Sequence, residues 1–142
     1  MRKHSASITI NASPETVWRI LTDASSYPNW DASMDRIEGK LALGETVKFF
    51  TKLSSQAFPV RVTRFEPNGK MVLTGGMPLS LFKSERTHTL TPEKDGQTTF
   101  HTEEIFSGWL LPIFGRSIPD LTENFRAFAA GLKKQAEKTG SK

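Results

Sequence analysis

The sequence contains no cysteine, and this absence excludes several kinds of chemistry at once. Without a thiol, the chain has no thiolate nucleophile, no thiolate metal ligand and no disulfide. Its 142 residues are enough for one domain, because a chain of this size buries about 68–70% of its extended surface without such staples. The lack of cysteine and of an apolar stretch after Met1 suits a reducing compartment, so we expect a cytoplasmic protein.

Long hydrophobic runs are also missing. The most apolar segment, Trp109–Phe114, contains Pro112 and is far shorter than the roughly 20 residues that cross a bilayer. We therefore expect no membrane span. Three interpretations of this segment stay open: a lid over the mouth of a pocket, a loop that touches a membrane transiently, or a buried junction between a strand and a helix.

Positive charge exceeds negative charge only slightly, with 19 Lys and Arg against 15 Asp and Glu, a net charge of +4. Part of the excess lies near the C-terminus, in Lys133, Lys134, Lys138 and Lys142. Nucleic-acid binders usually combine such a cluster with aromatic side chains, and none follows Phe128. We interpret these lysines as a solvated helix end, where the helix dipole favours cations, and predict no nucleic-acid partner. The oligomeric state stays open.

The sequence motifs of several common enzyme classes are absent. There is no G-x-S-x-G elbow, no P-loop and no G-x-G-x-x-G, which leaves serine hydrolysis and nucleotide binding without support. The three histidines, His4, His88 and His101, do not have the spacing of metal ligands. His101 and Glu103 share one face of a predicted strand, but that face is the outer one. We predict no metal and no cofactor.

Alternation of apolar and polar residues predicts a mostly antiparallel β-protein with helices at defined places. Strands are expected over 5–12, 34–38, 45–53, 56–66 and 80–91, with further strands after Gly69 and Gly96. Ser13 and Pro14 are typical of an N-cap and first helical residue. A second short helix or turn is expected over Tyr27–Trp30, and a long helix over 117–138. Gly131 in that helix costs about 1 kcal/mol relative to Ala, which we interpret as close packing of helix on sheet.

Two hairpins have short turns that suggest a register for their strands. A two-residue loop at Ser54-Ser55 predicts Val47 opposite Val62. Asn68-Gly69 is a stronger hairpin signal because both residues tolerate positive φ, and it predicts Val62 opposite Gly75.

The last hairpin places polar side chains on the inner face of the sheet. Along residues 80–91 every second side chain belongs to a set that is rich in Lys and Thr, and we expect this set to face solvent. The side chains between them are therefore predicted to point inward. Glu93–Gln97 suits a three-residue loop closed by Gly96 in the left-handed conformation. Apolar matching and charge pairing both favour this register. It sets four pairs opposite one another: Leu90 and Phe100, His88 and Thr102, Arg86 and Glu104, Ser84 and Phe106.

These elements predict a curved sheet with space inside it. Seven strands at about 4.8 Å spacing span roughly 29 Å, whereas one helix with side chains is about 10–12 Å across. The sheet must therefore curl around the long helix. Inward-pointing Arg86, His88, Thr102 and Glu104 favour a hydrated or ligand-filled cavity over a dry core, because burying such groups unpaired is costly.

The order of elements resembles the START-like helix-grip superfamily, also called Bet v 1-like or SRPBCC, and most of all its bacterial polyketide cyclase/dehydrase-like branch. The resemblance is carried by Ile8–Trp18, Tyr27–Trp30, Gly44 before Val47, Glu104–Gly108 and the terminal helix. It implies an α+β helix-grip fold over residues 1–142: a curved seven-stranded antiparallel sheet wrapped around a long C-terminal helix, with two short helices after the first strand. It also implies a hydrophobic-ligand cavity between sheet and helix, and it transfers no catalytic signature.

Three interpretations of the inward polar patch stay open. The patch orients a ligand carbonyl or hydroxyl, or His88 and Glu104 move protons in a cyclisation, or the four residues form a satisfied ion pair and histidine inside a wet sheet. Large aromatics nearby line the cavity or belong to the core. The candidate ligand-binding residues are Trp30, Phe49, Val60, Leu73, Arg86, His88, Thr102, Glu104, Phe106, Trp109 and Phe125.

We therefore expect a protein that binds or carries a hydrophobic small molecule, such as a lipid, a quinone or a polyketide-like compound. Two alternatives are kept: an enzyme of the polyketide cyclase, aromatase or dehydratase type, and a protein-interaction module of the chaperone-activator kind. Whether the protein catalyses a reaction stays open at this point.

Overall fold

The computed structural model of the protein describes residues 2–32, 34–52, 58–77, 82–108 and 122–140. The elements follow in this order: β1 (Arg2–Ile10), α1 (Pro14–Thr22), a 3₁₀ turn (Ala24–Ser26), α2 (Tyr27–Trp30), β2 (Met34–Glu38), β3 (Thr46–Thr51), β4 (Phe58–Glu66), β5 (Lys70–Met77), β6 (Phe82–Pro92), a 3₁₀ turn (Lys94–Gly96), β7 (Thr98–Ser107) and α4 (Thr122–Gly140). The predicted start of the long helix, 117–121, lies outside the described residues.

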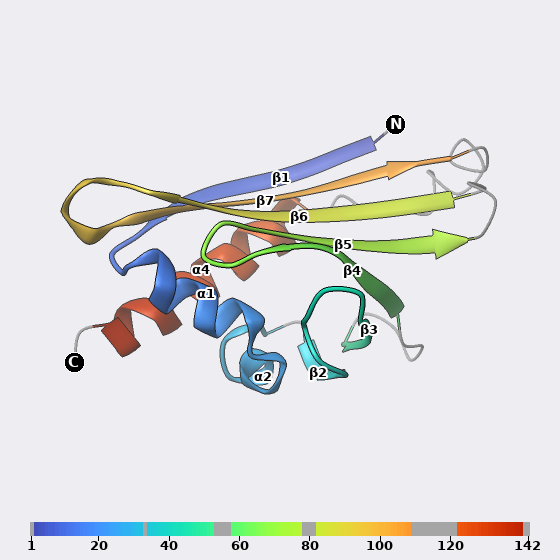
Figure 1. Cartoon of the computed structure of the whole chain (residues 1–142), viewed down its shortest axis with the longest axis horizontal. Coiled ribbons are helices and arrows are strands. Elements are labelled where there is room, and N and C mark those ends of the chain that lie inside the picture. Colours follow the sequence, from blue (N-terminus) through green and yellow to red (C-terminus); the bar gives the residue numbers. More distant parts are fainter. Residues whose placement is uncertain (1, 33, 53–57, 78–81, 109–121, 141–142) are drawn as a thin grey trace.

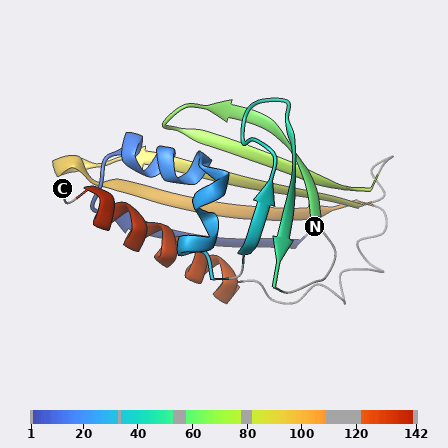
Figure 2. The same ribbon diagram turned by 90° about the horizontal axis from the view of Figure 1, so that it is seen from below.

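The strands form one antiparallel sheet in the order β1-β7-β6-β5-β4-β3-β2. The helices all lie on one side of it (Figure 1). Helix α4 packs on β1 at one edge, α2 packs on β2 at the other, and α2 also contacts α4, so the sheet curls around the helical layer. The α+β helix-grip fold is confirmed. The sheet continues beyond the N-terminal end of α4 (Figure 2).

Helix α1 begins as the sequence predicts. The Ser13 hydroxyl caps it by accepting a hydrogen bond from the Thr16 amide at 3.2 Å, and Pro14 occupies the first helical position. Val17 and Leu21 are fully buried on its inner side. A cap of this kind stabilises a short helix by about 1 kcal/mol, and the helix closes one end of the curled sheet.

The register predicted for the last hairpin is confirmed. Arg86 pairs with Glu104 and His88 with Thr102 across β6 and β7. The loop has three residues, Lys94–Gly96, and Gly96 has a φ of +76°. Asp95 also has a positive φ of +61°, which the predicted type I turn did not include.

The registers predicted for the other two hairpins are wrong: they differ by two residues at Val47 and at Val62, and by one residue between the β4 bulge and the following turn. Val47 faces Val60, and Val62 faces Leu73. The β4–β5 pairing contains a bulge between Val62 and Arg64 and closes after Glu66, so the loop is three residues long with Asn68 at φ +63°. A shift of two residues preserves which side chains point inward, so the concave face keeps its predicted composition.

Gly131 lies in α4 where this helix crosses α2. The prediction that Gly131 packs on the sheet is wrong, because its close neighbour is the backbone of Trp30 in α2. A Cβ added at this position would overlap the backbone carbonyl oxygen of Trp30. The glycine therefore allows the two helices to approach closely. Trp30 itself is buried between Tyr27 and Phe128, with ring centroids 4.5 and 5.1 Å away.

Candidate functional site

One row of inward-facing residues crosses five strands of the sheet. In register order it runs from His4 on β1 through Glu104, Arg86 and Leu73 to Val62 on β4. The other four residues of the row are buried, whereas Arg86 is half-buried. The row brings an acid, a base and a histidine together on an otherwise apolar concave face.

Arg86 and Glu104 form the ion pair at the centre of this row. Arg86 Nε donates to Glu104 Oε2 at 2.7 Å, and Arg86 Nη2 donates to the same oxygen. The Arg86 side chain is 25% exposed and that of Glu104 is 10% exposed. No described residue accepts a hydrogen bond from Arg86 Nη1, which carries two N–H donors.

Aromatic rings surround the ion pair. The Arg86 guanidinium carbon lies 4.9 Å from the centre of the Phe125 ring on α4, a cation–π distance. The His4 ring meets Phe106 and Phe125 edge to face, with centroids 6.1 and 6.2 Å apart. Leu73, Phe106 and Phe125 are all buried. The predicted residues Leu73, Arg86, Glu104, Phe106 and Phe125 therefore lie around one place.

The next row inward is closed to solvent. His88 and Thr102, which face each other, are each 1% exposed. The His88 ring stacks on Phe100 at 5.6 Å and on Phe128 at 5.4 Å. Its Nδ1 is buried and has no hydrogen-bond partner among the described residues. Burial, and then the charge of Arg86, lower the pKa of His88 to about 3, so the imidazole is neutral near pH 7.

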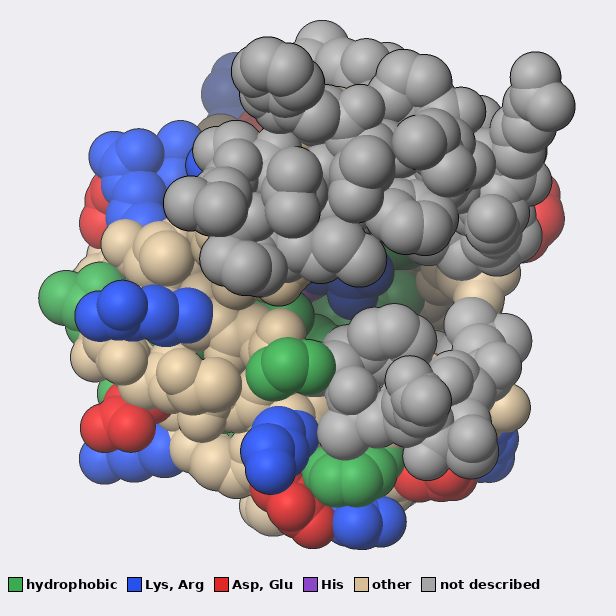
Figure 3. All heavy atoms as spheres, turned by 90° about the vertical axis from the view of Figure 1, so that its right-hand side faces the viewer, with side chains coloured by type: hydrophobic (Ala, Val, Ile, Leu, Met, Phe, Trp, Pro, Cys, Tyr) green, Lys and Arg blue, Asp and Glu red, His purple; other side chains and the backbone are tan. Residues whose placement is uncertain are grey.

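Accessibility thus changes along the inner face of β6. Ser84 and Arg86 are half-buried, whereas His88 and Leu90 are buried. The accessible end is the one at which β6 begins and β7 ends. Figure 3 views the molecule from that side and shows hydrophobic and basic side chains near the centre of this face.

Three other predicted residues lie in different surroundings. Trp30 is a core residue whose indole N–H donates to Ser26 Oγ at 3.1 Å. Phe49 is buried on β3, and Val60 is half-buried on β4 beside Gly75. Trp109, and the segment Trp109–Phe114 as a whole, lie outside the described residues.

Sequence reasoning missed two residues of this region. His4 lies just before the strand predicted over 5–12, yet it is buried opposite Glu104. Extending the alternation of Ala6 and Ile8 back by one step would have placed it on the inner face. Phe128 was not among the candidate ligand-binding residues, although its ring contacts His88, Phe100, Tyr27 and Trp30.

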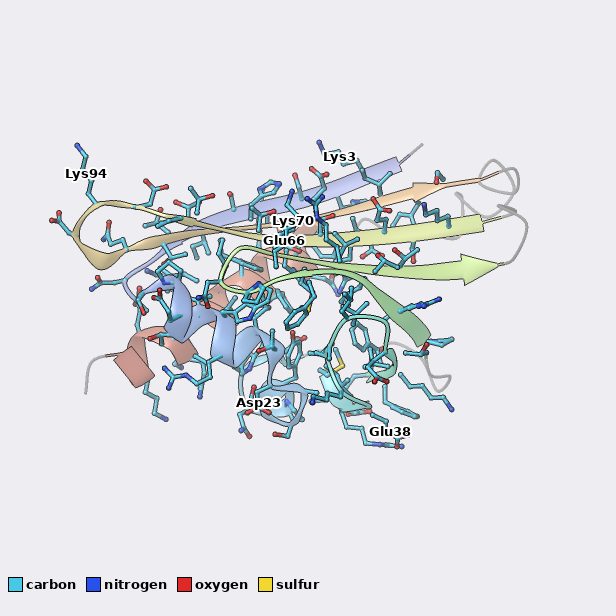
Figure 4. All side chains as sticks on the ribbon, viewed as in Figure 1. Lys3, Asp23, Glu38, Glu66, Lys70 and Lys94 are labelled. Atoms are coloured by element: carbon cyan, nitrogen blue, oxygen red, sulfur yellow. The ribbon has the colours of Figure 1, made fainter. Side chains whose placement is uncertain are left out.

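His101 and Glu103 lie on the convex face, as predicted. Lys3 joins them there, with its Nζ 3.0 Å from Glu103, and its side chain points away from the helices (Figure 4). This hydrogen bond lowers the pKa of Glu103. Within the described residues no three His, Asp or Glu side chains are grouped so as to hold a metal ion.

The helices in the described part of the chain are too short or too polar to cross a bilayer.

A family model described as "Polyketide cyclase / dehydrase and lipid transport" matches residues 1–137. The chain belongs to this family. No curated protein matches it significantly. The family assignment agrees with the START-like, SRPBCC resemblance seen in the sequence.

Solved structures share the fold at low identity. An aromatase/cyclase of Streptomyces sp. R1128 is 14% identical, with a TM-score of 0.77 over 96% of this chain and 94% of that one. A START superfamily protein of Mycobacterium smegmatis is 18% identical, with a TM-score of 0.74 over 96% and 98%. The Aha1 dimer of Colwellia psychrerythraea is 22% identical, with a TM-score of 0.73 over 96% and 97%. At these identities the similarity establishes the fold alone.

Proposed function

We propose that this protein binds an apolar small molecule, such as a lipid, a quinone or a polyketide-like compound, on the concave face of the sheet beside α4. The polar end of the ligand accepts a hydrogen bond from Arg86. Its apolar part lies against Phe106, Phe125 and Leu73. The family description, which joins polyketide chemistry with lipid transport, supports this class of ligand.

One observation carries the proposal: the Arg86 side chain on the concave face is 25% exposed although its guanidinium lies against the Phe125 ring and pairs with Glu104. An ion pair with a purely structural role would not require its arginine side chain to be exposed to solvent. Small-molecule sites typically combine apolar walls with a few placed polar groups. Arg86, with one nitrogen free for a ligand and Phe125 beneath it, has these properties.

Binding is better supported than proton transfer by His88 and Glu104. A pKa near 3 leaves His88 neutral and weakly basic at pH 7, whereas a general base works best with a pKa near the working pH. Glu104 is engaged by two nitrogens of Arg86. Neither group is therefore arranged for proton transfer.

The test is native mass spectrometry of gently purified protein, followed by thermal shift with a panel of lipids and quinones. The blocking variant is Ser84→Trp, because Ser84 is on the concave face directly before Arg86 in the inward set. The control is Lys83→Trp, which adds the same ring to the outer face of the same strand. We expect bound ligand and a raised melting temperature in the wild type and in Lys83→Trp, and neither in Ser84→Trp.

Two results would overturn the proposal. Protein that is always empty and shows no thermal shift with any apolar compound would remove ligand binding. Capture of a protein partner that is equally strong in Ser84→Trp and in the wild type, with no ligand effect, would favour the interaction module instead.

A further inference from the structure

The charges of the described concave face are balanced before any ligand arrives. Arg86 contributes one positive charge, and Glu104 cancels it through two hydrogen bonds to one oxygen. A further acid, Asp31 at the end of α2, is buried as well. The burial of Tyr27 and then the charge of Asp31 raise the pKa of Tyr27, and the charge of Arg86 acts in the opposite direction, so both charges act on this interior. Among the described residues, this interior therefore offers no basic side chain without an acidic partner to an anionic ligand.

We infer that the site selects an uncharged ligand with an acceptor oxygen, such as an ester, ketone or quinone, over a carboxylate, and that Glu104 sets this selection. The inference rests on the proposed function, because it concerns the ligand of that same site. An acceptor oxygen is what the free Nη1 of Arg86 can bind, since a guanidinium donates and cannot accept.

The physical reason is the cost of placing like charges together away from water. A ligand carboxylate that reaches Arg86 comes close to the Glu104 carboxylate, whose side chain is only 10% exposed. Such a like-charge contact in a partly desolvated site weakens binding of the carboxylate. A neutral oxygen takes the same hydrogen bond without that repulsion. His88 adds no compensating charge, because its pKa is about 3.

The experiment compares two probes with the same acyl chain, the charged dodecanoic acid and its uncharged methyl ester, by titration at about pH 8, where the acid is ionised and ordinary imidazoles are neutral. We expect the wild type to bind the ester at least about tenfold more tightly than the acid. In Glu104→Gln, which keeps an oxygen for Arg86 but removes the negative charge, the acid should gain at least about tenfold while the ester changes little.

The matched control is Glu103→Gln. It makes the same substitution at the neighbouring residue, but Glu103 lies on the convex face beside Lys3. It should leave the preference for the ester unchanged. The double variant Arg86→Gln/Glu104→Gln removes the guanidinium as well as the carboxylate, so the acid should lose there the gain in affinity that it shows in Glu104→Gln. It also provides the comparison if Glu104→Gln alone fails to fold, since it retains no unpaired charge.

The outcomes separate this inference from the proposed function. If the wild type binds the acid as tightly as the ester, or if Glu104→Gln and Glu103→Gln have the same effect, the inference is overturned while ligand binding stands. If the double variant prefers the acid, the inference is overturned as well. If neither probe binds any variant and no other apolar compound does, the proposed function fails and the inference fails with it.

Discussion

His88 on β6 and Phe128 on α4 stack with their ring planes 9° from parallel and their centroids 5.4 Å apart. The contact joins the middle of the sheet to the middle of the long helix. It also keeps the imidazole away from water, which is the main reason for its low pKa. The imidazole of His88 therefore packs in the core as an aromatic ring, although it contains two nitrogen atoms.

The first prediction concerns stability against pH. The unfolded chain takes up a proton at His88 near pH 6.5, whereas the folded protein does so only near pH 3. Between these values the unfolded state binds more protons, so the free energy of unfolding decreases as the pH falls, by at most about 1.4 kcal/mol per pH unit. This stability is fully present above pH 6.5.

Urea unfolding from pH 7 down to about pH 5.5 measures this slope where ordinary carboxyl groups stay largely ionised. His88→Phe should keep the stacking, remove the slope and lose no stability at pH 7, because it removes a buried nitrogen without a partner. The control is His101→Gln on the convex face, which should keep the slope of the wild type. Equal slopes in all three proteins would contradict the assignment of this pH dependence to His88.

The second prediction concerns Gly131. Replacing it with alanine should destabilise the protein by roughly 2 kcal/mol or more, because the new Cβ overlaps the Trp30 carbonyl oxygen and the helices must move apart. Helix propensity alone would give a gain of about 1 kcal/mol. The neighbouring control, Ala130→Gly at an exposed position, should lose only about that amount. A more stable Gly131→Ala variant would show that α2 and α4 are not in close contact.

The third prediction concerns the ion pair as a structural element. Arg86→Gln leaves Glu104 buried without its partner, and we expect a loss of roughly 2–4 kcal/mol. Adding Glu104→Gln should recover at least half of this loss. The convex pair Lys3 and Glu103, 3.0 Å apart and more exposed, serves as the control cycle and should show a coupling below about 1 kcal/mol. Similar coupling energies in the two cycles would contradict the burial of the inner pair.

The sequence predicted which side chains point inward better than it predicted which residues face each other. Alternation depends only on the period of the strand, so it survives a shift of two residues. For that reason Val47, Val62 and Leu73 were placed on the correct face although their pairing was wrong. The bulge after Val62 has no clear sequence signal, and it changes the register of the β4–β5 hairpin.

The β6–β7 hairpin was different because two independent features agreed on one register. Its loop length matched a known turn, and only that register set Arg86 against Glu104. The position of His88 beneath Phe128 could not be predicted in the same way. It depends on where α4 crosses the sheet, and that is determined by packing between elements far apart in the chain, including the contact of Gly131 with Trp30.

The location of the ligand can be tested most directly by NMR with a spin-labelled fatty acid methyl ester. Leu73 and Val72 are neighbours on β5, but Leu73 is paired in the row of Arg86 and Val72 points to the opposite face. A ligand on the concave face should broaden the methyl resonances of Leu73 and Val62 strongly and those of Val72 much less. Equal broadening of Leu73 and Val72, or broadening of Val72 alone, would contradict binding between the sheet and α4.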